Sequence, residues 1–434
     1  MTRPHRLRRL LAPTRGLQKA IGLQLLGLVT LVLGGALSFK NLILPFFSWL
    51  FRIFRNWAEL VIPDHSAETI HWLGGLFLLL GGLCMWRGIR ALMTHIIETL
   101  NPSLKGGKVD IYMRRQMLAQ GPRVVALGGG TGLSTLLRGL KTHTSNITAV
   151  VTVTDDGGSS GKLVREKGMI PPGDIRNCLV ALADAERAMI DLFQHRFKDD
   201  SGSLSGHSIG NLLLAALADQ SKGDFEIAVQ KASDVLAIRG QVVPSTFDQV
   251  ALKAELEDGS VVEGETSIVA AGSRIRRLFL NPIEVKANRT ALEAIREADI
   301  IVMGPGSVYT SIIPNLLVPG MAEALVASPA PKVYVCNVMT QRGESEGMTA
   351  SQHVAAIQEQ VGRRVFDYII VNTAIPSESA IEKYAGAGQQ PVEADIDRLR
   401  AMNQRILPGD YMSETDLVRH DPMKVASRVM ALVE

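Results

Sequence analysis

The sequence lacks most of the patterns by which metal-dependent and redox proteins are found. Its 434 residues include three cysteines, Cys84, Cys178 and Cys336, and contain neither a C-x-x-C pair nor a Cys/His cluster. A disulfide framework and a structural zinc site are therefore excluded, and a reducing compartment is indicated. Aromatic residues make up 5% of the chain and are not interleaved with basic residues, so no nucleic-acid partner is expected.

Familiar catalytic motifs are missing as well. No glycine-rich loop ends in G-K-[ST], no H-E-x-x-H occurs, and no Ser, His and Asp stand in a known hydrolase order. The candidates for proton transfer are Asp155, Asp156, Asp174 and His207. The catalytic residues stay unknown, with Asp155 and Asp156 as the first candidates.

Charge is absent from two long segments near the N-terminus. Residues 20–39 and 69–86 contain no Asp, Glu, Lys or Arg, and each is about long enough to cross the ~30 Å core of a bilayer. The outer flanks, 1–19 and 87–121, are basic, which favours the cytoplasmic side for both. The pattern predicts a two-helix transmembrane hairpin in the bacterial inner membrane, with both termini and the main domain cytoplasmic. A signal peptide and a buried helical hairpin are the alternatives.

The segment between these two stretches, 40–68, has a different character. Its run L-I-L-P-F-F-S-W-L-F-R-I-F-R-N-W is aromatic and amphipathic. Such a run predicts a helix that lies in the outer membrane interface, and a third span over 42–62 is the alternative.

Residues 122–434 have the pattern of a nucleotide-binding domain of the α/β class. Short apolar runs alternate with helical patterns, at 123–127, 147–153, 299–303, 332–338 and 366–372. This alternation predicts a Rossmann-like, mostly parallel sheet with helices on both faces. Between 242 and 280 a D-G turn separates two alternating segments, which predicts a small β-hairpin insertion.

The most informative stretch follows the first predicted strand. V-V-A-L-G-G-G-T-G-L-S, residues 124–134, is a strand–glycine–helix unit that lets a phosphate approach bare backbone at a helix N-terminus. The dinucleotide fingerprint is incomplete because Leu133 stands where its third glycine belongs. A tight turn without a ligand is the alternative. The ligand-binding residues expected here are Gly128, Gly129, Gly130, Thr131, Gly132, Leu133 and Ser134.

The second predicted strand ends in T-D-D-G-G-S-S-G. Asp155 and Asp156 stand where such folds meet a ribose or base, and the pair could instead hold Mg²⁺. Ser159 and Ser160 belong to a second candidate anion site. A solvated surface loop is the alternative.

Three further segments carry similar chemistry. In P-P-G-D-I-R-N-C, Asp174 is a predicted helix N-cap, followed by Arg176 and Asn177. G-H-S-I-G-N begins another helix with His207 and Asn211, where a cap or surface role for the histidine is the alternative. The stretch D-I-I-V-M-G-P-G-S-V-Y-T repeats the strand–glycine–helix pattern and adds Gly304, Pro305, Gly306, Ser307 and Thr310. Strand ends of a parallel sheet share one edge, so all these loops are expected to form one crevice.

Taken together, these motifs resemble those of the YvcK family of bacterial gluconeogenesis factors, part of the CofD-like superfamily related to 2-phospho-L-lactate transferases. The resemblance covers roughly 122–434 and includes V-Y-V-C-N-V-M-T-Q, with Asn337, and V-R-H-D-P, with Arg419. It implies a bound UDP-sugar, such as UDP-N-acetylglucosamine, and a role in cell shape and envelope synthesis on gluconeogenic carbon. Arg419 would grip the diphosphate; a surface charge on the last helix is the alternative.

Two functions are therefore expected, from different classes. The first is a membrane-anchored regulatory protein that binds a nucleotide sugar, meets envelope-synthesis proteins and forms a homo-oligomer. The alternative is a Mg²⁺-dependent phospholactyl or phosphoryl transferase of the CofD type, with Asp155 and Asp156 at the metal. A nicotinamide-dependent oxidoreductase is a weaker third reading, because the fingerprint is incomplete.

Overall fold

The computed structural model describes residues 40–61, 76, 79–89, 116–198, 202, 204–386, 388–414 and 417–433. The chain divides into two compact units, Met1–Val109 and Asp110–Glu434.

In the first unit, the aromatic segment forms one helix, α3 (Lys40–Val61), and a shorter helix covers Leu79–Ile89. The first predicted span, 20–39, lies outside the described residues, as does much of 69–86. Among the helices that the structure describes, no single one is both long and apolar enough to cross a bilayer. Two consecutive helices, Val308–Leu317 and Met321–Ala327, are long and apolar enough only when taken together, and the chain bends by 81° between them. Most of their side chains are buried in the main domain.

The second unit is built around a seven-stranded sheet in which every neighbouring pair is parallel. Its order is β10-β9-β8-β7-β1-β2-β3. The strands are β1 (Val124–Gly128), β2 (Ile147–Val151), β3 (Gln241–Pro244), β7 (Ile300–Met303), β8 (Lys332–Val335), β9 (Tyr368–Asn372) and β10 (Arg405–Gly409). The five strands predicted from apolar runs are confirmed.

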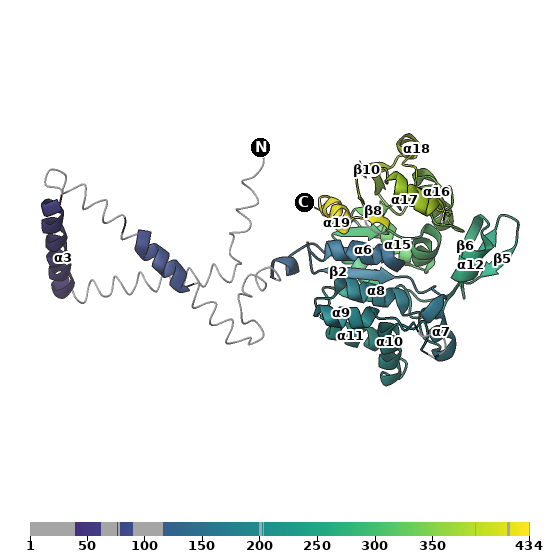
Figure 1. The fold of residues 1–434 in the computed structure, drawn as a ribbon, viewed down its shortest axis with the longest axis horizontal. Helices are drawn as coiled ribbons and strands as arrows, with labels where there is room; N and C mark the ends of the chain where they lie inside the picture. The colour runs from purple at the N-terminus through teal and green to yellow at the C-terminus, as the bar shows by residue number, and fades with distance from the viewer. Residues whose placement is uncertain are drawn as a thin grey trace. The chain divides into compact units, whose positions relative to one another are not determined.

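Alternate residues of β1 belong to two hydrophobic cores, one on each face of the sheet. Val124 and Ala126 pack in the first core and Val125 and Leu127 in the second, and all four are at most 2% exposed. The first core includes side chains of α6 (Gly130–Leu140), α7 (Gly158–Lys167), α8 (Gly173–Leu182), α9 (Arg187–Gln194), α10 (Ile209–Gln220), α11 (Phe225–Leu236) and α19 (Pro422–Met430). The second includes α13 (Arg289–Glu297), η3 (Val308–Ile312), α14 (Ile313–Leu317), α15 (Met321–Ala327), α16 (Ala350–Val361) and α18 (Ile396–Ala401). The prediction of helices on both faces is confirmed (Figure 1).

Two strands of the main sheet were not predicted, and both are outermost. β3 contains Pro244 and β10 contains Pro408. Proline lacks the N–H that a central strand needs, so a run that contains proline does not predict a strand. An edge strand tolerates proline because one of its sides has no neighbouring strand.

The predicted hairpin insertion is confirmed and is larger than expected. β4 (Ala251–Leu256) pairs with β5 (Val261–Glu263) across the D-G turn, and β6 (Ile275–Asn281) adds a third antiparallel strand. With α12 (Glu265–Ala271) these strands form a lobe beside the main sheet (Figure 1). The remaining elements are α17 (Glu378–Ala385) and the antiparallel pair β11 (Met412–Glu414) and β12 (Val418–His420).

The strand order places a switch point beside β1. The chain moves outward through β2 and β3 on one side and through β7 to β10 on the other. The loops after β1 and β7 therefore diverge to opposite faces, and this is where α/β sheets of this kind bind ligands.

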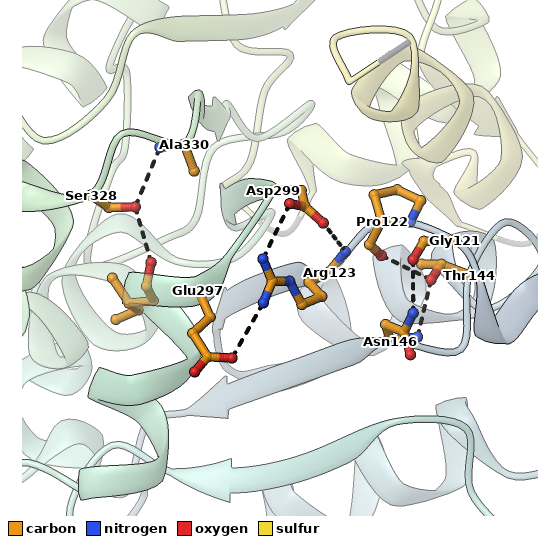
Figure 2. A network of polar contacts seen from close by, with 10 residues as sticks. Gly121, Pro122, Arg123, Thr144, Asn146, Glu297, Asp299, Ser328 and Ala330 are labelled. Carbon is orange, nitrogen blue, oxygen red and sulfur yellow. Dashed lines mark hydrogen bonds and ion pairs between the residues drawn. The ribbon is translucent and has the colours of Figure 1, made fainter.

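The opposite end of the sheet is fixed by polar contacts. Figure 2 shows the Arg123 side chain between Glu297 and Asp299, with N–O distances of 3.3 and 3.5 Å. Thr144 and Asn146 donate hydrogen bonds of 2.9 and 2.7 Å to backbone carbonyls that precede β1. The ion pairs of Arg123 are exposed and contribute little stability, whereas the hydrogen bonds of Thr144 and Asn146 are partly buried. They hold the start of β1 in register between its neighbours.

Candidate functional site

The two predicted glycine turns lie against each other at the switch point. The first glycine turn is 128–132, after β1, and the second is 304–307, after β7. A Cβ atom on Gly132 would lie 2.3 Å from the carbonyl oxygen of Pro305, closer than any side chain can approach. Gly130 has a φ of 63°, which glycine adopts without strain. The backbone approach explains why these positions hold glycine.

The start of α6 is bound by a carboxylate from a neighbouring helix. Asp174 Oδ2 accepts a hydrogen bond of 2.6 Å from the Gly130 N–H. The prediction that Asp174 caps its own helix is wrong, because α8 begins at Gly173, after Pro172, without a side-chain cap. Burial raises the pKa of the Asp174 carboxyl to about 6, although the Gly130 hydrogen bond opposes the shift. The aspartate thus occupies one of the backbone donors expected to meet an anion.

A crevice of ≈ 310 Å³ opens on the other side of the glycine turns. Its lining includes six predicted ligand residues: Thr131, Gly132, Pro305, Gly306, Asn337 and Arg419. Asn337 Oδ1 accepts a hydrogen bond of 3.1 Å from Gly306 N, which fixes the second turn. Arg419 is exposed and lies on β12, not on the last helix. Arg419 therefore lines a cleft of the size that small ligands occupy.

Other predicted residues form a separate polar network between the starts of α7, α8 and α10. Asn211 Nδ2 donates a hydrogen bond of 2.9 Å to Ser159 Oγ, which lies 3.0 Å from His207 Nδ1. Gly173 N donates 3.1 Å to Ser160 Oγ. The side chains of Ser159, His207 and Asn211 are all at most 5% exposed, so this network joins the three helix starts rigidly.

Arg176 crosses the same interior. It donates to Ser208 Oγ and, over 2.7 Å, to Asn177 Oδ1. Its Nε has no hydrogen-bond partner among the residues that the structure describes. Burial, followed by the charge of Arg196, lowers the pKa of Arg176. A buried guanidinium with a free donor is suited to an anionic group.

The adjacent aspartates after β2 have separate contacts. Asp155 Oδ1 accepts from Gly157 N over 2.9 Å. Asp156 Oδ1 accepts from both Thr266 N and Thr266 Oγ1, at 2.9 and 2.7 Å, and so ties the β2 loop to the start of α12. Within the described ranges, no group of three or more His, Cys, Asp or Glu side chains is arranged to hold a metal ion. A Mg²⁺ ion held by this pair would therefore take its other oxygen ligands from water and from the phosphates of a ligand.

Two acidic residues near the crevice were not predicted. Burial raises the pKa of Glu265 to about 9, and Asp155, Asp174 and Glu344 add to the shift. Burial also raises the pKa of Glu344 to about 7. Glu344 accepts hydrogen bonds from Ser307 and Thr310 of the second turn, the latter at 3.3 Å. Glu265 begins α12 and Glu344 lies in a turn, and neither belongs to a sequence motif, so only the fold reveals them.

Two predicted residues have a different role. The Leu133 side chain is fully buried in the core, and the Ser134 hydroxyl donates to Thr131 O at 2.9 Å within α6. Their side chains hold the helix rather than face the crevice.

Comparisons with known proteins show the family of this chain. A family model described as 2-phospho-L-lactate transferase CofD matches residues 124–412. A gluconeogenesis factor of Bacillus subtilis is 48% identical over 73% of this chain and 100% of its own length. One from Halalkalibacterium halodurans is 50% identical over 71% of this chain and 95% of its own. A protein of Nostoc sp. named as a gluconeogenesis factor is 44% identical over 96% of this chain and 90% of its own.

A solved structure shows the same fold. The crystal structure of a UPF0052 family protein from Bacillus halodurans has a TM-score of 0.69 and 49% sequence identity, and covers 71% of this chain and 99% of that one. A protein that consists almost entirely of the matching region thus forms this fold by itself.

Proposed function

Because this chain belongs to the CofD family and, within it, to the gluconeogenesis factors, we propose that it is a regulatory protein that binds a nucleotide sugar. The ligand class is a UDP-sugar, with UDP-N-acetylglucosamine as the first candidate. Binding would report the supply of envelope precursor and influence cell shape on gluconeogenic carbon. A homo-oligomer and envelope-synthesis proteins as partners belong to the same proposal.

One observation carries the ligand proposal: two glycine turns in backbone contact beside a crevice that an arginine lines. The bare backbone near Gly132 and Gly306 can approach phosphate oxygens, and the exposed Arg419 can bind two of them. Asn337 Oδ1 accepts from Gly306 N and holds the second turn in place at the crevice. These features favour tight binding, and none of them requires turnover.

The membrane part of the proposal comes from the charge-free segments 20–39 and 69–86. They would anchor the protein in the inner membrane, with the main domain on the cytoplasmic side. The match to the Nostoc protein covers 96% of this chain and so includes N-terminal residues. The Bacillus subtilis protein matches over its whole length but covers only 73% of this chain. Anchoring would therefore be a feature of some members.

Calorimetric titration of residues 110–434 tests the ligand proposal. The ligands are UDP-N-acetylglucosamine, UDP-glucose, NAD⁺ and GTP, each with and without Mg²⁺. Saturable binding of a UDP-sugar that does not need Mg²⁺ supports the proposal. Binding of GTP or NAD⁺ alone, or of no nucleotide sugar, contradicts it.

A second function, transfer of a phosphoryl-containing group, is favoured by the carboxyl groups of Asp155, Asp174 and Glu344, which lie close enough to Glu265 to raise its pKa. In such a reaction bound Mg²⁺ would neutralise phosphate charge, and the chain would mainly position the donor. Incubating the domain with Mg²⁺ and candidate donors, followed by mass spectrometry, separates the two functions. Product that disappears in Asp156→Asn would establish the transferase.

A further inference from the structure

We infer that α3 lies flat in a membrane surface, with its aromatic face in the lipid and its charged face in the headgroups. This inference deepens the membrane part of the proposed function and rests on it. It says what covers the exposed apolar face of α3, the long helix described in the first unit.

The apolar side of α3 forms a continuous stripe. Phe46, Trp49, Ile53, Trp57 and Leu60 follow one another at spacings of three, four, four and three residues, which places them on one helix face. Each is between 46% and 84% exposed. The rings of Phe46 and Trp49 lie next to each other, with centroids 6.0 Å apart. Large apolar side chains so exposed need an apolar environment.

The opposite side of the helix is polar. Ser48, Arg52, Arg55 and Glu59 occupy it. Arg52 Nε donates to Ser48 O at 3.3 Å, and Arg55 lies 3.5 Å from Glu59. Both arginines therefore extend along the polar face, away from the aromatic stripe. They are placed to meet negatively charged headgroups.

This division of faces favours a helix on the bilayer over a helix through it. Arg52 and Arg55 stand near the middle of the helix, and a spanning orientation would place them in the hydrocarbon, where charge is costly. Lying flat, the helix keeps both in water. α3 is long enough, at 22 residues, but is not apolar enough to meet the criterion for a span.

The composition also favours lipid over a second copy of the helix. A two-stranded coiled coil uses a narrow stripe of Leu, Ile or Val. The apolar face of α3 is wider than its continuous stripe, since Leu50 lies beside that stripe. It is also rich in Trp and Phe, the residues that prefer the boundary between headgroups and acyl chains.

Tryptophan fluorescence of the full chain can test this placement. All four tryptophans, Trp49, Trp57, Trp72 and Trp86, precede the main domain. The variant Trp72→Phe/Trp86→Phe leaves emission from α3 alone. It would be reconstituted into vesicles of phosphatidylcholine and phosphatidylglycerol that carry bromine either close to the headgroup or at the end of the acyl chain.

We expect bromine close to the headgroup to quench roughly twofold more strongly than bromine at the chain end, since interfacial helices lie at the acyl boundary. Stronger quenching by the deep bromine would show a spanning helix and overturn the inference. No quenching by either would show that the face is covered by protein or lies in water, and would overturn it as well.

A matched pair of variants tests the face. In the same background, Ile53→Glu places a carboxylate within the stripe, and Ser48→Glu places one on the polar side. Shallow quenching should fall in the first and persist in the second. Equal quenching in both would overturn the inference. Titration of UDP-N-acetylglucosamine into the same preparation measures ligand binding separately. The membrane inference and the proposed ligand function can therefore fail independently.

Discussion

Asp174 and Gly130 are 44 residues apart in the sequence, yet the carboxylate of one accepts a 2.6 Å hydrogen bond from the backbone N–H of the other. The bond connects the start of α6 to the start of α8 directly beneath the first glycine turn. A helix start that would otherwise attract an anion from solution is thus partly satisfied from within.

The first prediction concerns this bond. Asp174→Asn keeps an acceptor for the Gly130 N–H, whereas Asp174→Ala leaves the donor unpaired and should cost about 1–3 kcal/mol. Because the native pKa of about 6 lies above the ordinary 3.8, stability from Asp174 is present at low pH and is lost as the pH rises through about 6. Urea unfolding across this range should show a steeper loss in the wild type than in Asp174→Asn, in which Glu265 and Glu344 still contribute. Equal slopes in both would contradict the assignment.

The second prediction concerns Glu265. Its pKa is raised from 4.5 to about 9, so the native state holds a proton that the unfolded chain releases. The free energy of unfolding should therefore fall as the pH rises from about 4.5 to about 9. Glu265→Gln should be about 1–3 kcal/mol more stable than the wild type at the upper end. Glu263→Gln, on an exposed strand of the same lobe, is the control and should keep the wild-type pH dependence.

The third prediction separates steric contact from backbone strain in the first glycine turn. Gly132→Ala places a Cβ 2.3 Å from Pro305 O, so the two turns must separate, at a cost of about 3 kcal/mol. A Cβ on Gly130 meets nothing closer than 3.9 Å, and only its positive φ opposes alanine, at about 1 kcal/mol. Thermal unfolding of both variants measures the difference. If Gly130→Ala were the more destabilised, the contact between the turns would not be the reason for glycine.

The fourth prediction concerns Arg419. If it binds the diphosphate, Arg419→Ala should weaken binding of UDP-N-acetylglucosamine roughly 10- to 100-fold in calorimetry, with little change in stability. Arg419→Lys should recover part of the loss. Arg296→Ala, next to Glu297 at the opposite end of the sheet, is the matched control and should bind like the wild type. Unchanged affinity in Arg419→Ala would remove this residue from the site.

The sequence predicted those parts of the fold that depend on local patterns. Buried parallel strands are nearly continuous apolar runs, so β1, β2, β7, β8 and β9 were found. β3 and β10 were missed because each includes a proline, which only an edge position can accept. The three-stranded lobe was predicted as a hairpin because the D-G turn is a local signal, whereas pairing with β6 is a long-range contact.

The candidate site was predicted where glycine or spacing marks it, and missed where only tertiary contact does. Strand-end geometry predicted one crevice for all the loops, but of these loops only the two glycine turns line it, together with Asn337 and Arg419 from the family resemblance. Glu265 and Glu344 were missed since neither belongs to a motif, and it is folding that brings Glu265 close to Asp155, Asp174 and Glu344. Asp174 was placed at the start of the correct helix but assigned to the wrong partner, because its hydrogen bond crosses 44 residues.

The prolines of the outermost strands have a consequence for assembly. Each removes a donor from an open border of the sheet, at Pro244 on one side and Pro408 on the other. A strand of a neighbouring molecule cannot form a complete set of backbone hydrogen bonds with either edge strand, which disfavours aggregation through the sheet edges. Copies of this chain should therefore associate through their helical surfaces, leaving each seven-stranded sheet confined to one molecule.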